Sequence, residues 1–260
     1  MFEFNAINHT VFDIPGYFFF TIVGLVVSIS IYIVLLYEKR LSLPQNVRIL
    51  FISFIFSFAF SKLFGCISGI YRDIGLNQKI SLDSIMQTGI VYYGGLFGLL
   101  FSYMTCLKMV HQYVEAINVL AVCIPLFHSV SRVGCFFGGC CYGKESNSLF
   151  TINYTTRELG EIITAQRIPI QLIEAIFNLG IFLYLLKLIH SDNWENQHIL
   201  KKYLLVYSIG RFIIEFLRGD IARGVIFGVS FSQIISICIW VLLVYQESKN
   251  SKEETNTWVY

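Results

Sequence analysis

Arg132 stands at the end of a long apolar run and is followed at once by a glycine- and cysteine-rich stretch. The eleven residues 133–143 contain four glycines and three cysteines. A guanidinium keeps its charge wherever it lies, and a charge at membrane depth costs at least a few kcal/mol, so it usually marks a function. Phosphate is a natural partner of arginine, and successive glycine N–H groups also bind anions. The stretch therefore predicts an anion site, unless Arg132 only pairs with a helix end or a carboxylate.

A second polar group follows the spacing of a helix face. Tyr207, Arg211, Glu215 and Arg218 stand at positions i, i+4, i+8 and i+11 in an otherwise apolar segment. In lipid such a stripe must face the bundle interior, pair internally or line a cavity. Since Glu215 can neutralise only one arginine, the stripe and Arg132 together predict surplus positive charge that would bind an anion. A closed ion-pair network is the alternative.

Two shorter motifs carry polar or small residues. In the segment 92–98, Gly94 and Gly98 have the GxxxG spacing that lets a helix or a ligand approach closely, and the tyrosine pair before them needs hydrogen-bond partners. In the segment 167–174, a proline suits the first turn of a helix, and Gln171 and Glu174 share one helical face. Helix packing and a plain helix start are the alternative interpretations.

The composition indicates what must position these residues. Of 260 residues, 55% are hydrophobic and only 14% are charged, and the mean hydropathy is +0.65, whereas a soluble domain has about 25% charged residues. We therefore expect an all-α integral membrane protein. A net charge of +2 gives no reason to expect a nucleic-acid partner.

Runs of about 20 apolar residues predict seven spanning helices in one domain, 1–246, with a polar cytoplasmic tail at 247–260. The first span lacks the basic start of a secretory signal, so we expect it to be retained. The predicted spans are 17–37, 48–70, 89–109, 114–136, 170–190, 201–218 and 228–246.

The loop charges predict the orientation of the chain. The N-terminal tail has no Lys or Arg before Lys39, and the first connection is rich in both, so the N-terminus is expected outside and the C-terminus in the cytoplasm. This places the loops 143–168 and 218–228 on the outer face. The first of these is the longest connection, and long loops often cover a binding site.

Three of the seven cysteines fall together in the motif after Arg132, namely Cys135, Cys140 and Cys141. They lack the CxxC spacing of a zinc site and have no nearby pair of histidines, so the sequence predicts no metal. Adjacent cysteines form a strained disulfide, which also argues against a membrane thiol–disulfide protein that would use Cys140 and Cys141.

Together these motifs resemble the prolipoprotein diacylglyceryl transferase family. The resemblance runs in order from about residue 17 to 246, and its most specific pieces are 131–136, 169–174 and 211–218. Family members carry Gly-Arg-hydrophobic-Gly-Asn-Phe at the first of these. The family fold implies seven spanning helices and a small outer head, for which we expect parts of 143–168 and of 5–13.

The resemblance implies a reaction in the bacterial cell membrane. The family transfers the diacylglyceryl group of phosphatidylglycerol to the lipobox cysteine of a preprolipoprotein and releases glycerol phosphate, with no cofactor or metal. Arg132 and Arg211 would stabilise charge on the leaving phosphate, Glu215 would orient Arg211, and Tyr207 matches a tyrosine of the family's site. The implied donor-binding residues are Arg132, Arg211, Arg218, Gly94, Gly95, Gly134, Cys135, Gln171 and Glu174.

The chain departs from the family pattern at three positions. Tyr93 replaces the histidine of a His-Gly-Gly motif, Cys135 replaces asparagine, and Cys140 replaces glutamate. Since tyrosine is a poor base near neutral pH, we expect Tyr93 to act as a hydrogen-bond donor or proton shuttle in a divergent branch. The alternatives are a paralogue with another acceptor and a phospholipid-binding protein without catalysis.

Overall fold

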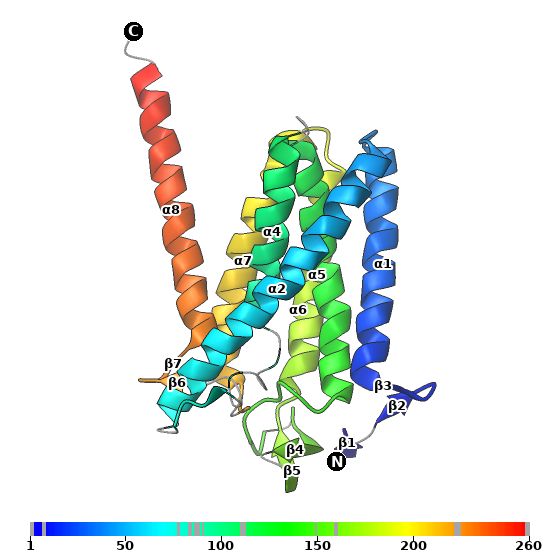
Figure 1. Ribbon diagram of the computed structural model, residues 1–260, viewed down its shortest axis with the longest axis vertical. Coiled ribbons are helices and arrows are strands. Elements are labelled where there is room, and N and C mark those ends of the chain that lie inside the picture. Colours follow the sequence, from blue (N-terminus) through cyan, green and yellow to red (C-terminus); the bar gives the residue numbers. More distant parts are fainter. Residues whose placement is uncertain are drawn as a thin grey trace.

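The computed structural model describes residues 3–6, 9–76, 79–82, 85, 89, 91–109, 113–148, 150–158, 161–220 and 225–257. Within this part the chain has seven long helices that run side by side in a bundle (Figure 1). They are α1 (Gly16–Glu38), α2 (Leu43–Gly75), α4 (Tyr92–Lys108), α5 (Tyr113–Phe137), α6 (Ile170–Ile189), α7 (Ile199–Ile214) and α8 (Phe231–Thr257).

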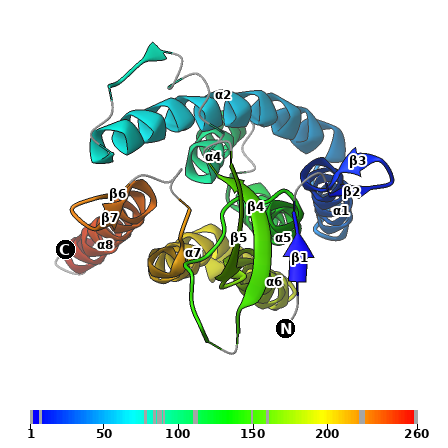
Figure 2. The ribbon, with the colours of Figure 1, turned by 90° about the horizontal axis from the view of Figure 1, so that it is seen from below.

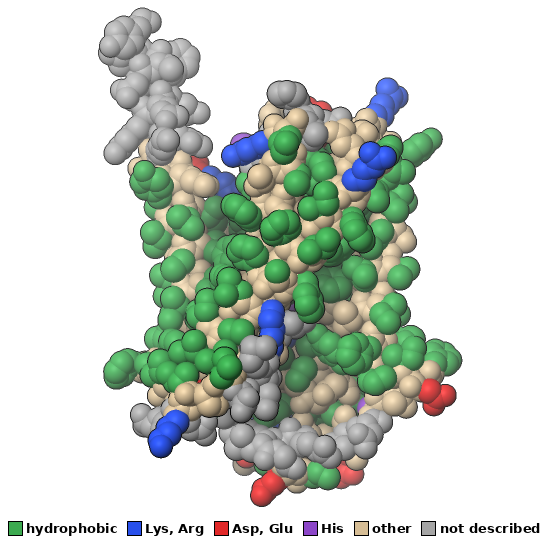
Figure 3. All heavy atoms as spheres, viewed as in Figure 1, with side chains coloured by type: hydrophobic (Ala, Val, Ile, Leu, Met, Phe, Trp, Pro, Cys, Tyr) green, Lys and Arg blue, Asp and Glu red, His purple; other side chains and the backbone are tan. Residues whose placement is uncertain are grey.

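The expected all-α integral membrane architecture is confirmed. Among the described residues five helices are long and apolar enough to cross a membrane, namely α1, α2, α5, α6 and α8. Over its spanning window 78% of the residues of α5 are buried, against at most 39% in the other four helices, so α5 is the core of the bundle. Figure 3 shows apolar side chains covering the outer faces of the helices, as expected of a surface in contact with lipid.

Short strands gather at one end of the bundle, which we call the sheet end (Figures 1 and 2). β1 (Glu3–Asn5) pairs in parallel with β4 (Ile152–Glu158), which pairs antiparallel with β5 (Glu161–Arg167). Two small hairpins, β2 (Thr10–Val11) with β3 (Ile14–Pro15) and β6 (Val225–Ile226) with β7 (Val229–Ser230), complete the strands.

The head expected from 143–168 and 5–13 is therefore built around a sheet and not from loops alone. Its strands are rich in Ile and Thr, which favour extended backbone. Beneath it Ala6, Phe136, Tyr142 and Tyr154 form a small buried cluster. The Tyr154 hydroxyl donates a hydrogen bond of 2.5 Å to the backbone oxygen of Phe136, which fastens the sheet to the end of α5.

The pairing of β1 with β4 also bears on the two shorter helices. α4 has 17 residues and α7 has 16, which is below the usual length of a span. Since β1 and β4 lie on one side of the membrane, an even number of crossings must separate them, and α4 is needed as the fourth beside α1, α2 and α5. By the same reasoning α6 leaves the sheet end and α7 returns to it, since Lys144 N–H donates to the Leu217 oxygen.

Several predicted spans have other ends in the structure; α2, for example, runs from Leu43 to Gly75 where the span 48–70 was predicted. The span predicted at 201–218 ends as a helix at Ile214 and continues as the 3₁₀ turn η2 (Glu215–Leu217). The helix α8 runs through Thr257, so residues 247–257 of the predicted tail continue the last span as helix. Residues 258–260 and part of the loop 218–228, namely 221–224, lie outside the described residues.

Helix α4 packs against α2 through its glycines. A Cβ atom on Gly94 would lie 2.5 Å from the Phe60 oxygen, and one on Gly98 would lie 2.5 Å from the Phe56 oxygen. Because neither contact leaves room for a side chain, the GxxxG spacing here lets two helices approach.

We therefore expect Gly98→Ala to destabilise the protein by about 1–3 kcal/mol, because α2 must move to admit the methyl group. Thermal unfolding in detergent measures the effect. Gly180→Ala is the matched control: a Cβ there meets no atom within 4 Å, and alanine favours a helix. Equal unfolding temperatures for the two variants would contradict this account of the packing.

Candidate functional site

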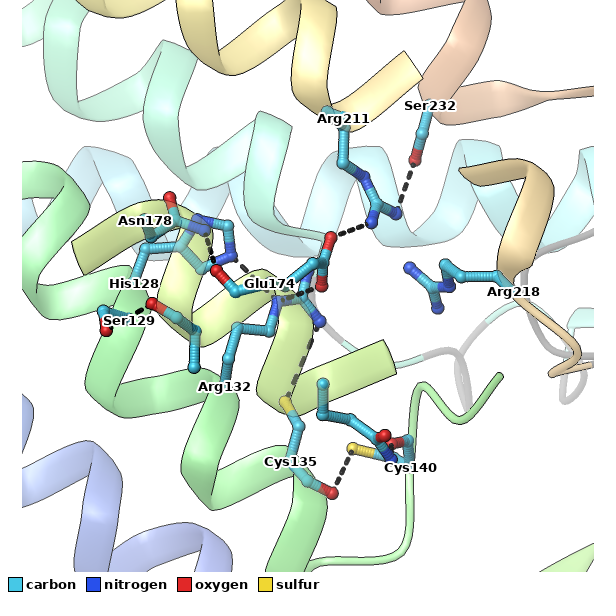
Figure 4. Close-up of polar contacts among 12 residues, drawn as sticks. His128, Ser129, Arg132, Cys135, Cys140, Glu174, Asn178, Arg211, Arg218 and Ser232 are labelled. Carbon is cyan, nitrogen blue, oxygen red and sulfur yellow. Dashed lines mark hydrogen bonds and ion pairs between the residues drawn. The ribbon is translucent and has the colours of Figure 1, made fainter. Parts of the chain in front are cut away.

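Charged side chains from three helices form an ion-pair network near the sheet end, and Figure 4 shows its centre, where Glu174 lies between Arg132 and Arg211. Arg132 Nε on α5 lies 2.7 Å from Glu174 Oε2 on α6. Arg211 on α7 contacts the other oxygen of Glu174, and its Nη2 lies 2.6 Å from Glu215 Oε2. Arg218 Nη1 is 4.0 Å from the same Glu215 oxygen. All five side chains are buried.

Glu174 is the centre of this network, because its two carboxylate oxygens hold arginines from two different helices. The sequence placed Glu174 beside Gln171 on one face of a helix, and the structure adds what that face meets. Gln171 Nε2 donates 2.8 Å to the Cys140 oxygen, which joins the start of α6 to the turn after α5.

The predicted surplus of positive charge is not found among the described residues. Arg218 forms a two-point contact with Asp220, at 2.8 Å from Nε and 2.7 Å from Nη2. Three arginines therefore face three carboxylates, and their formal charges cancel. The sequence count missed that Glu174 reaches both Arg132 and Arg211, and it missed Asp220 because that residue lies beyond the helix whose face was counted.

Arg132 nevertheless keeps hydrogen-bond donors that the described residues do not use. A guanidinium has five N–H donors. Its Nε contacts Glu174 and His128, the latter at 3.0 Å, and its Nη1 has only a long contact of 4.0 Å with Cys135 Sγ. A polar ligand beside the terminal nitrogens could accept the remaining hydrogen bonds.

Aromatic rings pack together beside the arginines. The rings of His128 and Tyr92 stack at 3.7 Å, and Tyr207 lies 5.4 Å from each of them. Tyr92 and Tyr203 share a hydroxyl hydrogen bond of 2.7 Å. In the described part of the chain no hydrogen-bond partner is found for the buried Tyr207 hydroxyl. It is thus available to a ligand.

His128 is the residue of this site that sequence reasoning did not single out. It lies four residues before Arg132 on α5, and its Nε2 accepts the hydrogen bond from Arg132 Nε. Residues four apart on a helix share a face, so this spacing could have identified it.

Tyr93 and Arg211 both contact helix α8. Its hydroxyl lies 2.8 Å from Ser236 Oγ, which also donates to the Ser232 oxygen. Arg211 Nη2 lies 3.4 Å from Ser232 Oγ, so Tyr93 and Arg211 contact neighbouring turns of one helix.

The glycines expected at a donor-binding site face other helices. Gly94 and Gly95 are turned toward α2, where a Cβ on Gly95 would lie 3.3 Å from Ser57 Oγ. A Cβ on Gly134 would lie 3.1 Å from the Tyr17 oxygen on α1. These glycines position α4 and α5, which carry Tyr93 and Arg132.

The three cysteines of the motif lie together beside the network, with each sulfur within 4.8 Å of the others. Hydrogen bonds from the Cys135 and Cys140 thiols hold the pKa of Cys141 well below its usual range, and the neighbouring Arg218 and Arg132 act in the same direction. Three thiols therefore lie at the edge of the arginine network.

Comparison with known proteins adds an independent finding. A family model described as prolipoprotein diacylglyceryl transferase matches residues 5–246. A phosphatidylglycerol–prolipoprotein diacylglyceryl transferase 2 of Clostridium perfringens is 32% identical over 190 residues, which cover 72% of this chain and 68% of that protein. Transferases of the same description from Clostridium tetani (28% over 199 residues, 74% and 78% covered) and Prochlorococcus marinus (30% over 223 residues, 76% and 75% covered) are also similar.

Proposed function

This chain belongs to the prolipoprotein diacylglyceryl transferase family, and we propose that it transfers the diacylglyceryl group of phosphatidylglycerol to the lipobox cysteine of preprolipoproteins. Glycerol phosphate is released, and the site faces the outside of a bacterial cell membrane. The observation that carries the proposal is the buried network of Arg132, Glu174 and Arg211 at one end of an apolar bundle. A fixed guanidinium with unused donors at that depth suits a lipid phosphate.

In this reaction the acceptor sulfur forms a bond to the glyceryl carbon that carries the phosphate oxygen. The carbon–oxygen bond breaks, and its electron pair leaves with glycerol phosphate. Arg132 would donate to the phosphate oxygens as their charge grows, a kind of stabilisation worth about 10²–10³ in rate per donor. Arg211, held between Glu174 and Glu215, would act beside it, with Arg218 at the rim.

The remaining polar residues take supporting roles in the proposal. Glu174 positions the two arginines, Gln171 holds the turn that carries Cys140 and Cys135, and the Tyr207 hydroxyl is free to bind substrate. The thiol proton must leave before or during attack. Tyr93, hydrogen-bonded to Ser236, would relay it.

We expect Tyr93→Phe to lower the transfer rate by about 10²-fold, the smaller end of what a positioned proton donor contributes. The measurement is glycerol phosphate release by purified protein in detergent. Ser236→Ala is the companion variant: it removes the partner of the hydroxyl but leaves the hydroxyl itself, so it should retain more activity than Tyr93→Phe. Full activity of Tyr93→Phe would remove Tyr93 from the mechanism.

The proposed function is tested by incubating the purified protein with phosphatidylglycerol and a lipobox peptide. Release of glycerol phosphate should require both substrates and should yield a peptide heavier by one diacylglyceryl group. A peptide whose cysteine is replaced by serine is the control. Lipid that binds but is never consumed, with several lipobox peptides, would indicate a phospholipid-binding protein. Consumption of lipid without modified peptide would indicate another acceptor, which the changes at Cys135 and Cys140 would explain.

A further inference from the structure

The turn that follows α5 gathers three sulfur atoms into one small volume. The Sγ atoms of Cys135, Cys140 and Cys141 lie within 4.8 Å of one another, and among the described residues they form the only group of three or more potential metal-ligand side chains this close together. Cys135 is buried, and the other two are half-buried. The spacing in sequence carried no metal signature, so the cluster is a product of the fold.

The backbone between these cysteines is shaped to bring them together. Cys140 N–H donates to the Cys135 oxygen at 3.2 Å, so the chain turns back on the end of the helix. Gly139 has a φ of +71° and Cys141 a φ of +58°, a left-handed conformation that a non-glycine residue rarely adopts. Two hydrogen bonds hold the turn from outside, one from Gln171 to the Cys140 oxygen and one from Thr156 to the Gly139 oxygen. The cluster is therefore preorganised.

We propose that Cys135, Cys140 and Cys141 form a binding site for a thiophilic divalent cation, Zn²⁺ in the first place. Zinc takes thiolate ligands at about 2.3 Å in a tetrahedral arrangement, which puts the sulfurs about 3.8 Å apart. The sulfurs of the cluster lie within 4.8 Å of one another, which is at most about 1 Å more than this spacing. Three protein ligands leave the fourth position to water or an external thiolate, which is the pattern of reactive and not of structural zinc sites.

The charges around the cluster favour this class of ion. Three thiolates and a divalent cation carry one net negative charge, and the Arg132 guanidinium lies next to Cys135, with Nη1 at 4.0 Å from Sγ. A monovalent ion would leave two negative charges in the same place. Mg²⁺ and Ca²⁺ prefer oxygen ligands, which the cluster does not offer. The proposal concerns the ion alone and does not depend on the transfer reaction.

The test is metal binding by the full-length protein, purified under reducing conditions and freed of metal with a chelator. Zn²⁺ binding is measured by elemental analysis after dialysis, and Cd²⁺ serves as a spectroscopic probe through its thiolate charge-transfer absorption. We expect one ion per chain. Changes around a metal site already cost about 10–100-fold in affinity, so loss of a ligand in Cys140→Ser or Cys141→Ser should cost at least about 100-fold. The cadmium absorption should fall with each thiolate removed.

A matched control is a single protein carrying Cys66→Ser, Cys106→Ser and Cys238→Ser, which removes three thiols away from the cluster and should bind the ion like the wild type. Monodispersity and thermal unfolding show whether each variant is folded. Cys140 and Cys141 lie in the turn after α5, so their variants still test the site if Cys135→Ser, inside the helix, is unstable. The proposal is overturned if reduced wild-type protein with titratable thiols binds no Zn²⁺ or Cd²⁺. It is equally overturned if binding survives in both turn variants or is lost in the control.

Discussion

Arg132→Lys is expected to lower glycerol phosphate release by about 10²–10³-fold. Lysine keeps the charge but has one compact ammonium group, so it cannot hold Glu174 and His128 while it also donates to a phosphate. The loss should appear mainly in kcat, because the donors act on charge that develops as the phosphate leaves. Arg211→Lys should behave similarly, since its guanidinium joins Glu174 to Glu215.

The control for this prediction is Arg72→Lys. Arg72 also pairs with a buried carboxylate, Asp73, at 2.7 Å, but it lies in the last turn of α2 outside the network. Its rate should stay within a few-fold of the wild type. If Arg132→Lys retained most of its activity while lipid binding was unchanged, the phosphate would have to be stabilised elsewhere.

Glu174→Ala is expected to cost about 3–5 kcal/mol of stability, because it removes the carboxylate shared by two buried arginines. Arg211 keeps Glu215, but the buried charge of Arg132 loses its carboxylate partner. Glu174→Gln keeps an oxygen acceptor and the shape of the side chain, so its loss should be smaller. Thermal unfolding in one detergent, with lipid absent, compares the variants.

Glu145→Ala serves as the control, since Glu145 pairs with Arg167 at 3.3 Å but its side chain is 66% exposed. Exposed pairs contribute about 0–1 kcal/mol. An unfolding temperature of Glu174→Ala equal to that of Glu145→Ala would show that the network is relaxed or hydrated and not tightly coupled.

The helices and the meeting of the arginines could be predicted from the sequence, because both follow from the membrane. Long apolar runs must be helices in lipid, and charges such as Arg132 and Arg211 must turn inward and find partners. The sequence of a single segment does not reveal which helices it packs against. Glu174 was visible as part of a helix face, but only the packing of α6 between α5 and α7 makes it the shared partner of both arginines.

Other features depend on contacts between distant or unusual parts of the backbone. Strand β1 has three residues and pairs with a segment far along the chain, so local patterns gave no sign of it. The cysteines come together because Gly139 and Cys141 take positive φ values, which spacing in sequence does not reveal. His128 was within reach of sequence reasoning, since it stands one helical turn before Arg132.

The parallel pairing of β1 with β4 constrains the order of folding steps during synthesis of the protein. Glu3 pairs with Asn153, so β1 has no partner until 150 further residues have been made. At ordinary translation speeds this interval is roughly 8–30 s. During that time α1, α2, α4 and α5 must enter the membrane, and β1 stays unpaired until β4 follows them. The head can form only after β4 has been made, so its assembly is a late step that requires the preceding helices to be inserted correctly.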